Sequence, residues 1–233
     1  MVQKKSKAGL TPAEEGSGRT RGRPRQYDPE QALAKAAEAF WKQGYAATSL
    51  DDLVAATGMN RPSLYAAFGD KRDLYLKTLT RYQQQSRAIG AKITADDPPL
   101  RVFLKRFYEA ALDIYLASGD EARGCYSIST APAQAVTDPA VRDFLATSIG
   151  GTDAFLAKQI TRARERGEVP SNADPHALAQ LATAALHTIA VRARVGVPRK
   201  QLRAVAAAAI DVICGRKNLD AALVRLANRA HFD

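Results

Sequence analysis

The chain has 233 residues, a formal net charge of +10 and an isoelectric point near 9.7. This length suits one or two domains, and the positive charge favours an anionic partner such as nucleic acid. No run approaches the roughly 18 consecutive apolar residues of a membrane span, the basic N-terminus lacks the apolar core of a secretory signal, and two cysteines make no disulfide framework. We therefore expect a reduced, cytoplasmic protein with no membrane partner.

Residues 1–26 form a basic arm that we expect to be flexible. Residues 1–27 carry seven basic and two acidic side chains, which is half of the net charge of the chain. Glycine and proline recur there, and large apolar residues are almost absent, so the segment cannot bury enough surface to fold alone. Basic runs are usually solvated tails, and this interpretation applies to Lys4, Lys5 and Lys7.

The first helix is predicted to begin at Asp28-Pro29, because aspartate is a good N-cap and proline suits the first helical turn. Apolar residues then recur at helical spacing: Leu33, Ala36, Ala37, Phe40 and Trp41. We expect Trp41, the only tryptophan, to pack as a structural residue beneath the two short helices that follow.

Those two short helices are separated by a tight turn. Ser49 can cap the first, and Asp52 can close a capping box with it. Gly58 suits the left-handed backbone at the end of this helix. Asn60 can cap the second helix, which ends at Gly69. This is the pattern of a helix-turn-helix unit, whose second helix contacts base edges in the major groove of DNA.

From Tyr27 to Tyr82 the sequence resembles the N-terminal DNA-binding domain of the TetR/AcrR family of bacterial regulators, over about a quarter of the chain. Each similar piece would be weak alone, but together and in order they are specific. The pieces are Phe40 with Gly44-Tyr45, Thr48-Ser49, Ala56-Thr57-Gly58, Ser63-Leu64-Tyr65 and Phe68-Gly69-Asp70-Lys71.

The resemblance implies a set of DNA-facing residues: Thr48, Ser49, Asn60, Arg61, Ser63, Tyr65, Ala66 and Lys71. Thr48 and Ser49 would meet a phosphate at a helix N-terminus, where free N–H groups favour an anion, and Tyr65 and Lys71 would bind further phosphates. Arg61 is the best candidate for base readout, because its planar fork can bind O6 and N7 of guanine together. The alternative is that these residues form an ordinary solvated surface.

We expect the second helix to make few base contacts, because Ala66 and Ala67 stand where many relatives have His or Tyr. Part of the specificity would then come from DNA shape or from the arm. Arg21, Arg23 and Arg25 run directly into the first helix, and an arm with alternating arginines can enter the minor groove. We therefore assign these three residues to DNA contact.

The remainder of the chain shows helical patterns and no sustained alternation of period two, so we predict an all-α fold. A long fourth helix from Lys71 would link residues 27–72, the helix-turn-helix domain, to residues 73–233, a larger ligand-binding and dimerisation domain. Further helices are predicted from residues 100, 139, 174 and 198, and residues 219–230 form a short helix or a frayed tail. We expect an irregular segment between Gly124 and Pro132, and a weak point at Gly150-Gly151.

Helices 174–195 and 198–215 are rich in alanine and apolar over a wide arc. In the family, the equivalent helices pair with their copies in a four-helix interface. The resemblance therefore implies a homodimer on a palindromic operator of double-stranded DNA. The alternative is that both helices are buried within one subunit.

The resemblance also implies an unidentified small-molecule effector, which can act only by binding two states of the protein differently. The expected ligand-binding residues are Phe103, Phe107, Tyr108 and Tyr115, facing Phe144 or Phe155, together with Cys125 and His187. The alternatives are plain: an aromatic stripe is more often core than a ligand site, and a lone histidine on an apolar helix is more often a core or interface group.

Cys125 suggests an alternative function, a redox- or electrophile-sensing regulator, because a helix N-terminus favours the thiolate. The competing interpretation is that Cys125 is buried and inert. Cys214 is expected in the core. A non-specific architectural DNA-binding protein would explain the charge but not the apolar C-terminal half. No nucleophile elbow, phosphate loop, paired carboxylates or metal-ligand cluster is found, so we predict no enzyme activity, metal or cofactor. The main prediction is a ligand-released repressor, since blocking a promoter needs no surface for polymerase.

Overall fold

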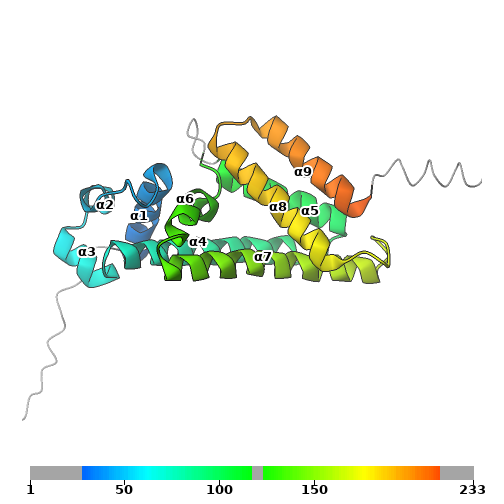
Figure 1. Ribbon diagram of the computed structural model, residues 1–233, viewed down its shortest axis with the longest axis horizontal. Coiled ribbons are helices and arrows are strands. Elements are labelled where there is room, and N and C mark those ends of the chain that lie inside the picture. Colours follow the sequence, from blue (N-terminus) through cyan, green and yellow to red (C-terminus); the bar gives the residue numbers. More distant parts are fainter. Residues whose placement is uncertain (1–27, 117–122, 216–233) are drawn as a thin grey trace, which may run out of the picture.

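The computed structural model describes residues 28–116 and 123–215, and within these ranges the chain is helical without strands (Figure 1). This confirms the predicted all-α class. The helices are α1 (Pro29–Gln43), α2 (Leu50–Thr57), α3 (Arg61–Phe68), α4 (Lys71–Ile93), α5 (Leu100–Tyr115), α6 (Tyr126–Ala135), α7 (Pro139–Glu165), α8 (Pro175–Arg194) and α9 (Arg199–Cys214). The basic arm and residues 219–230 lie outside the described residues.

The helix-turn-helix begins and ends where the sequence predicts. The Ser49 hydroxyl accepts a hydrogen bond from the Asp52 N–H, and the Asp52 carboxylate accepts one from the Ser49 N–H, which completes a capping box. Gly58 ends α2 with a left-handed φ of 71°. The Asn60 side chain caps α3 by accepting a hydrogen bond of 2.9 Å from the Ser63 N–H.

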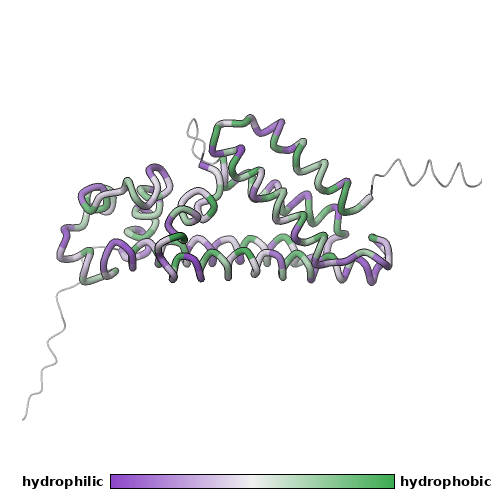
Figure 2. Tube along the Cα trace, viewed as in Figure 1, coloured by the Kyte–Doolittle hydropathy of each residue, from purple (hydrophilic) through white to green (hydrophobic). Residues whose placement is uncertain are grey.

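The long helices α4 and α7 run in nearly the same direction in the view of Figure 1, and α7 packs against α6 and α8 while α5 packs against α9. Apolar and polar residues alternate along each helix at helical spacing, so that each helix has an apolar side to bury (Figure 2). One core joins α5, α7, α8 and α9. A second core lies beneath the helix-turn-helix and includes Tyr126 and Ala131 of α6 and Val141 of α7.

The segment that we expect to be irregular is instead the regular helix α6, which continues through Pro132. A proline in a helix removes one backbone hydrogen bond, and here side chains facing α4 offset that loss. The hydroxyls of Tyr75 and Thr130 lie 2.7 Å apart, as do those of Thr78 and Tyr126, and all four residues are buried. Tertiary contacts therefore hold α6 in place.

Trp41 is buried in the core beneath the helix-turn-helix, as predicted. Its ring partners are Tyr82 of α4 and Tyr126 of α6, at centroid distances of 5.4 and 5.3 Å. The preceding residue, Phe40, points about 100° away around α1 and packs against Tyr75. Helix α7 is uninterrupted at Gly150-Gly151.

Gly124 holds the turn before α6 against α8. Its φ is +63°, and a Cβ atom at this position would lie 2.5 Å from the Ala190 carbonyl oxygen. We expect Gly124→Ala to lower the free energy of unfolding by at least about 2 kcal/mol, because it adds backbone strain and a backbone clash. Urea denaturation measures this change.

Gly150→Ala is the matched control. Gly150 is helical and has open space around its Cβ position. Alanine there should stabilise the protein by about 0.5–1 kcal/mol, because it restricts the unfolded chain and favours helix. Equal effects of the two substitutions would contradict the structural role of Gly124.

Candidate DNA-binding surface and effector pocket

Helix α3 presents its predicted DNA-facing side to solvent. Leu64 and Phe68 are buried, which turns Arg61, Tyr65 and Ala66 outward. Tyr65 is 44% exposed although it is a large aromatic residue. Ser63 is half-buried, and Asn60 is exposed while its side chain caps the helix. The arrangement leaves one arginine, one phenol and small side chains on the face that would enter a groove.

Arg61 forms an ion pair that the sequence does not predict. Its Nη2 lies 2.6 Å from Oδ1 of Asp51 on α2. The hydrogen bond to Asp51 raises the pKa of the Arg61 guanidinium. Both side chains are largely exposed, at 56% and 77%, so the pair contributes little to stability. It does orient the guanidinium towards α2 in the absence of DNA.

The predicted phosphate contact of Thr48 is wrong for its side chain. Thr48 is fully buried, and its hydroxyl donates a hydrogen bond of 2.7 Å to the Gly44 carbonyl. It therefore closes the turn between α1 and α2. Ser49 beside it is exposed at the N-terminus of α2, where a phosphate could meet free N–H groups.

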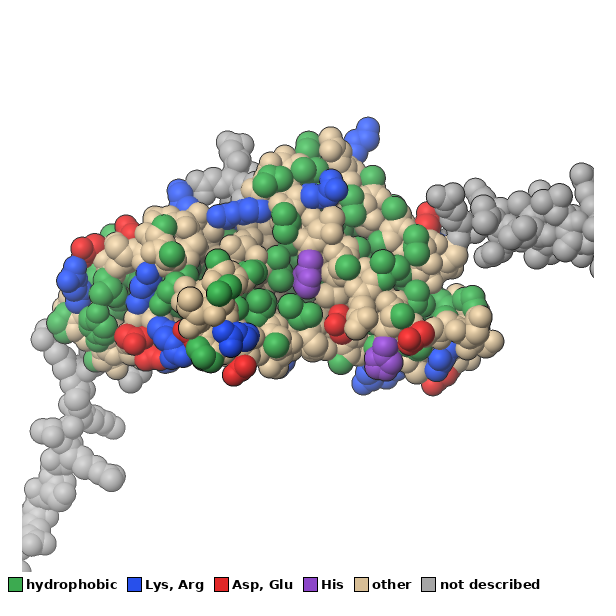
Figure 3. All heavy atoms as spheres, in the orientation of Figure 1, with side chains coloured by type: hydrophobic (Ala, Val, Ile, Leu, Met, Phe, Trp, Pro, Cys, Tyr) green, Lys and Arg blue, Asp and Glu red, His purple; other side chains and the backbone are tan. Residues whose placement is uncertain are grey.

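Lys71 lies at the start of α4, as predicted, and its Nζ sits 4.5 Å from the centre of the Tyr45 ring. Burial lowers the pKa of the Lys71 ammonium, while the Asp52 carboxylate opposes this shift. Acidic and basic side chains are interspersed on the visible face of this end of the molecule (Figure 3). The predicted arm residues Arg21, Arg23 and Arg25 lie outside the described residues.

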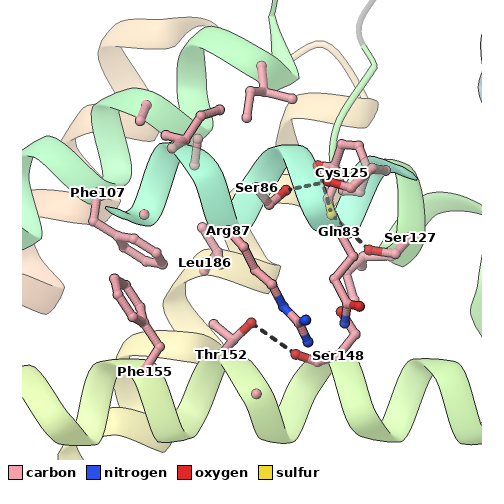
Figure 4. Close-up of a pocket in the computed structure, with 18 of the residues that line it drawn as sticks. Gln83, Ser86, Arg87, Phe107, Cys125, Ser127, Ser148, Thr152, Phe155 and Leu186 are labelled. Atoms are coloured by element: carbon pink, nitrogen blue, oxygen red, sulfur yellow. Dashed lines mark hydrogen bonds between the residues drawn. The ribbon is translucent and has the colours of Figure 1, made fainter. Parts of the chain in front are cut away.

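A cavity of about 450 Å³ lies among α4, α5, α6, α7 and α8 (Figure 4). Four of the predicted ligand-binding residues line it: Phe107, Tyr115, Cys125 and His187. Phe155, named as a possible facing residue, lines it as well. A volume of this size is typical of sites that enclose a small organic molecule.

Phe103, Tyr108 and Phe144 do not line this cavity, which corrects the predicted pocket wall. Phe103 is buried behind the wall, where its ring meets Phe155 edge-on at 5.7 Å. Tyr108 is buried and donates a hydrogen bond of 3.0 Å to the Ala182 carbonyl. Phe144 packs against the other core, beneath the helix-turn-helix. Helical spacing identifies apolar residues but does not tell which of them face a void.

The polar part of the wall is absent from the sequence prediction. It comprises Gln83, Ser86 and Arg87 of α4, Ser127 of α6, and Ser148 and Thr152 of α7 (Figure 4). These positions look like ordinary solvated helix faces in the sequence. Gly90 of α4 also lines the cavity, and a Cβ atom at this position would lie 3.3 Å from the Phe155 ring.

Cys125 is buried at the N-cap position of α6. It accepts a hydrogen bond from the Tyr82 hydroxyl at 3.4 Å and lies 3.3 Å from the Ser127 hydroxyl. Burial raises the pKa of the other thiol, Cys214, to about 11. Both cysteines are free. Cys125 is thus one polar atom of the cavity wall, and its burial does not favour the redox alternative.

The end of α1 is gripped by the C-terminal helices. The Arg194 guanidinium of α8 donates hydrogen bonds to the carbonyls of Trp41 and Lys42, at 2.9 and 3.0 Å. The Trp41 indole N–H donates to the Arg123 carbonyl at 3.0 Å. The Arg123 side chain lies over the Trp41 ring and pairs with Glu38 of α1. We call these residues the α1 junction.

Comparison with known proteins identifies the family of this chain. The model of bacterial regulatory proteins of the tetR family matches residues 32–78, and the tetracyclin repressor-like C-terminal domain matches residues 103–211. The HTH-type transcriptional repressor ComR of Escherichia coli strain K12 is 30% identical over 189 residues, covering 81% of this chain and 90% of ComR. The chain belongs to the TetR family.

Two further similarities agree with this assignment. The repressor BdcR of the same strain is 29% identical over 195 residues, covering 84% of this regulator and 93% of BdcR. The structure of the TetR family regulator CifR, a cysteine mutant complexed with 26-bp operator DNA, has a TM-score of 0.71 and 30% identity, covering 81% and 98% of the two chains. This TetR-family protein is thus a DNA-binding regulator of transcription, which confirms the interpretation of its helix-turn-helix.

Within residues 28–116 and 123–215, no helix is both long and apolar enough to cross a membrane. The same part of the chain holds no group of three or more His, Cys, Asp or Glu that could bind a metal ion.

We expect Arg194→Ala to lower the free energy of unfolding by about 1–2 kcal/mol, because it removes charged donors from the last carbonyls of α1. The emission of Trp41, the only tryptophan, should shift with it, since the indole lies at the altered contact. Urea denaturation followed by fluorescence measures both effects.

Arg192→Ala is the control for this experiment. Arg192 is exposed on the same helix and is not part of the α1 junction. We expect its loss to change stability by no more than about 0.5 kcal/mol. A similar cost for the two variants, or unchanged Trp41 emission in Arg194→Ala, would show that the junction does not fix α1.

Proposed function

We propose that this regulator is a homodimeric repressor, which binds a palindromic operator and releases it when a small molecule fills the cavity. One observation carries the proposal. The elements that line the cavity are also those that hold α1: α8 supplies His187 and Arg194, and the segment entering α6 supplies Arg123 and Cys125. A molecule that shifts these elements must disturb the α1 junction.

The DNA-binding part of the proposal rests on α3 and the elements around it. In this proposal Arg61 reads a base, and Ser49, Tyr65 and Lys71 bind phosphates that fix the position of the protein on the duplex. The exposure of Arg61, Ser49 and Tyr65 supports these roles. The predicted minor-groove contacts of the arm belong to the same proposal. The repressor names of ComR and BdcR support repression rather than activation.

The dimer rests on an apolar face that the described residues leave uncovered. The face follows one side of α8 and continues on α9; its members are Ala177, Leu181, Ala184, Thr188, Val191, Ala204, Ala208 and Val212. Val191 and Val212 are 55% and 67% exposed. Small side chains let helices approach closely, and two copies of one self-complementary face form a closed two-fold dimer. Such a dimer places two copies of α3 on two half-sites.

Release follows from differential binding. The Arg194 hydrogen bonds fix the end of α1, which in turn is packed against α4 through Phe40 and Tyr75. A molecule in the cavity changes the spacing of the two α3 helices only if it binds the released arrangement more tightly than the DNA-bound one. The required preference is a few kcal/mol, typical of coupling between two sites.

The experiment that tests this function is a gel shift of the full chain on DNA flanking its own gene, at physiological salt and with excess random competitor. A discrete complex that survives competitor supports a sequence-specific regulator. Where that DNA gives no complex, selection from random sequences identifies the operator. Failure of selection to enrich any sequence would overturn specific binding.

We expect Arg61→Ala to weaken operator binding by about 1–3 kcal/mol and to relax the preference at one position in each half-site, because a bidentate contact to guanine is lost. Fluorescence anisotropy with operator and random DNA measures the two affinities. Asp51→Asn is the control, since it removes the carboxylate that holds Arg61 but keeps the arginine. We expect its operator affinity to be unchanged or higher. Equal losses of Arg61→Ala on both DNAs would exclude base readout.

We expect Leu181→Glu to convert the dimer to a monomer and to abolish binding to the full palindrome, because a carboxylate would be buried at the centre of an apolar interface. Sedimentation velocity measures the assembly. Val136→Glu is the control: Val136 is 74% exposed at the end of α6, away from the proposed face. The interface is elsewhere if Leu181→Glu remains a dimer, or if Val136→Glu dissociates equally.

A further inference from the structure

The effector cavity has a polar end and an apolar end. Gln83, Arg87 and Ser148 lie at one end, between α4 and α7, and Phe107 and Phe155 face each other at the other end (Figure 4). The two phenyl rings lie 6.5 Å apart between centroids, which leaves an apolar slot for a chain or a ring.

Arg87 is the one fixed charge among the residues that line the cavity. Figure 4 shows its guanidinium reaching from α4 towards α7, near Ser148. The lining contains no Asp or Glu. His187 adds no fixed charge at neutral pH, because burial lowers the pKa of its imidazole, an effect that the nearby Asp153 carboxylate opposes. The exposed Arg87 is therefore the one fixed charge in the cavity lining.

This positive charge has no partner in the described part of the chain. Arg87 is exposed; some other exposed arginines pair, such as Arg106 with Asp96 and Arg203 with Glu109. Within residues 28–116 and 123–215, no carboxylate pairs with Arg87. In the same ranges the side chains of Gln83 and Ser148 make no hydrogen bond, so the amide N–H groups and the hydroxyl are available as donors, while the Ser148 backbone carbonyl accepts from the Thr152 hydroxyl. Three side chains with unused donors thus converge on one end of the cavity.

We propose that the effector is a small amphipathic carboxylate, whose carboxylate group binds Arg87, Gln83 and Ser148 and whose apolar body lies between Phe107 and Phe155. The planar guanidinium matches a carboxylate in geometry and in charge. A phosphate carries nearly two charges at neutral pH, which a single arginine does not balance. This inference rests on the proposed function of the cavity as the effector site, and it adds the chemical class of the effector.

Binding of phenylbutanoate, phenylbutanamide and phenylbutylamine to the full chain tests the inference by calorimetry, together with alkanoates from hexanoate to decanoate. The three phenyl compounds share one shape and differ in charge. We expect the acid to bind at least about tenfold more tightly than the amide, and the amine to bind most weakly. Because no DNA is present, failure of operator binding and failure of this inference are distinguishable.

Substitutions at Arg87 complete the test. Arg87→Met should weaken binding of the acid about tenfold and remove the preference over the amide, whereas Arg87→Lys should keep most of that preference. Lys92→Met is the control, since Lys92 is an exposed cation on α4 that does not line the cavity. Circular dichroism checks that each variant is folded. The inference is overturned by equal binding of acid and amide, by an equal effect of Lys92→Met, or by failure of every carboxylate to bind.

Discussion

The hold of Arg194 and Arg123 on the end of α1 is the interaction on which the rest of this structure depends. The last carbonyls of any helix lack partners within that helix. Here a guanidinium from α8 supplies donors to two of them, and the Trp41 indole returns a donor to the Arg123 carbonyl. Directional hydrogen bonds therefore connect the helix-turn-helix domain to the C-terminal helices.

An aromatic cluster joins the end of α1 to α4 and α6. Trp41, Tyr82 and Tyr126 meet at ring distances of 5.3 to 5.6 Å, and they come from three different helices. Tyr82 also lines the cavity, and its hydroxyl donates to Cys125. A close-packed cluster transmits a displacement better than it absorbs one. Under the proposed function, an effector beside Tyr82 would act on the same cluster that holds α1.

Local chemistry explains which parts of this fold are predictable from the sequence. Caps such as Ser49, Asn60 and Asp138 act on their own helices, so the starts of α2, α3 and α7 follow from a few neighbouring residues. Helix α6 and the contacts of Trp41 are different, because they depend on residues far away in the chain. No pattern within residues 124–135 records that Tyr75 and Thr78 will meet them.

The residues that line the cavity also divide into a predictable and an unpredictable set. Its aromatic side is partly predictable, because Phe107 and Tyr115 follow the apolar period of α5, but its polar side is not, because Arg87 on α4 resembles any solvated arginine. Under the proposed function, the side that the sequence does not predict is the one that selects the effector. An extra methylene in an apolar slot changes affinity by only about 1–3 kcal/mol, whereas unpaired polar groups in a site reject a mismatched ligand more strongly. Rings such as Phe107 and Phe155 accept many shapes, so under the proposed function the donors around Arg87 decide which small molecule is bound.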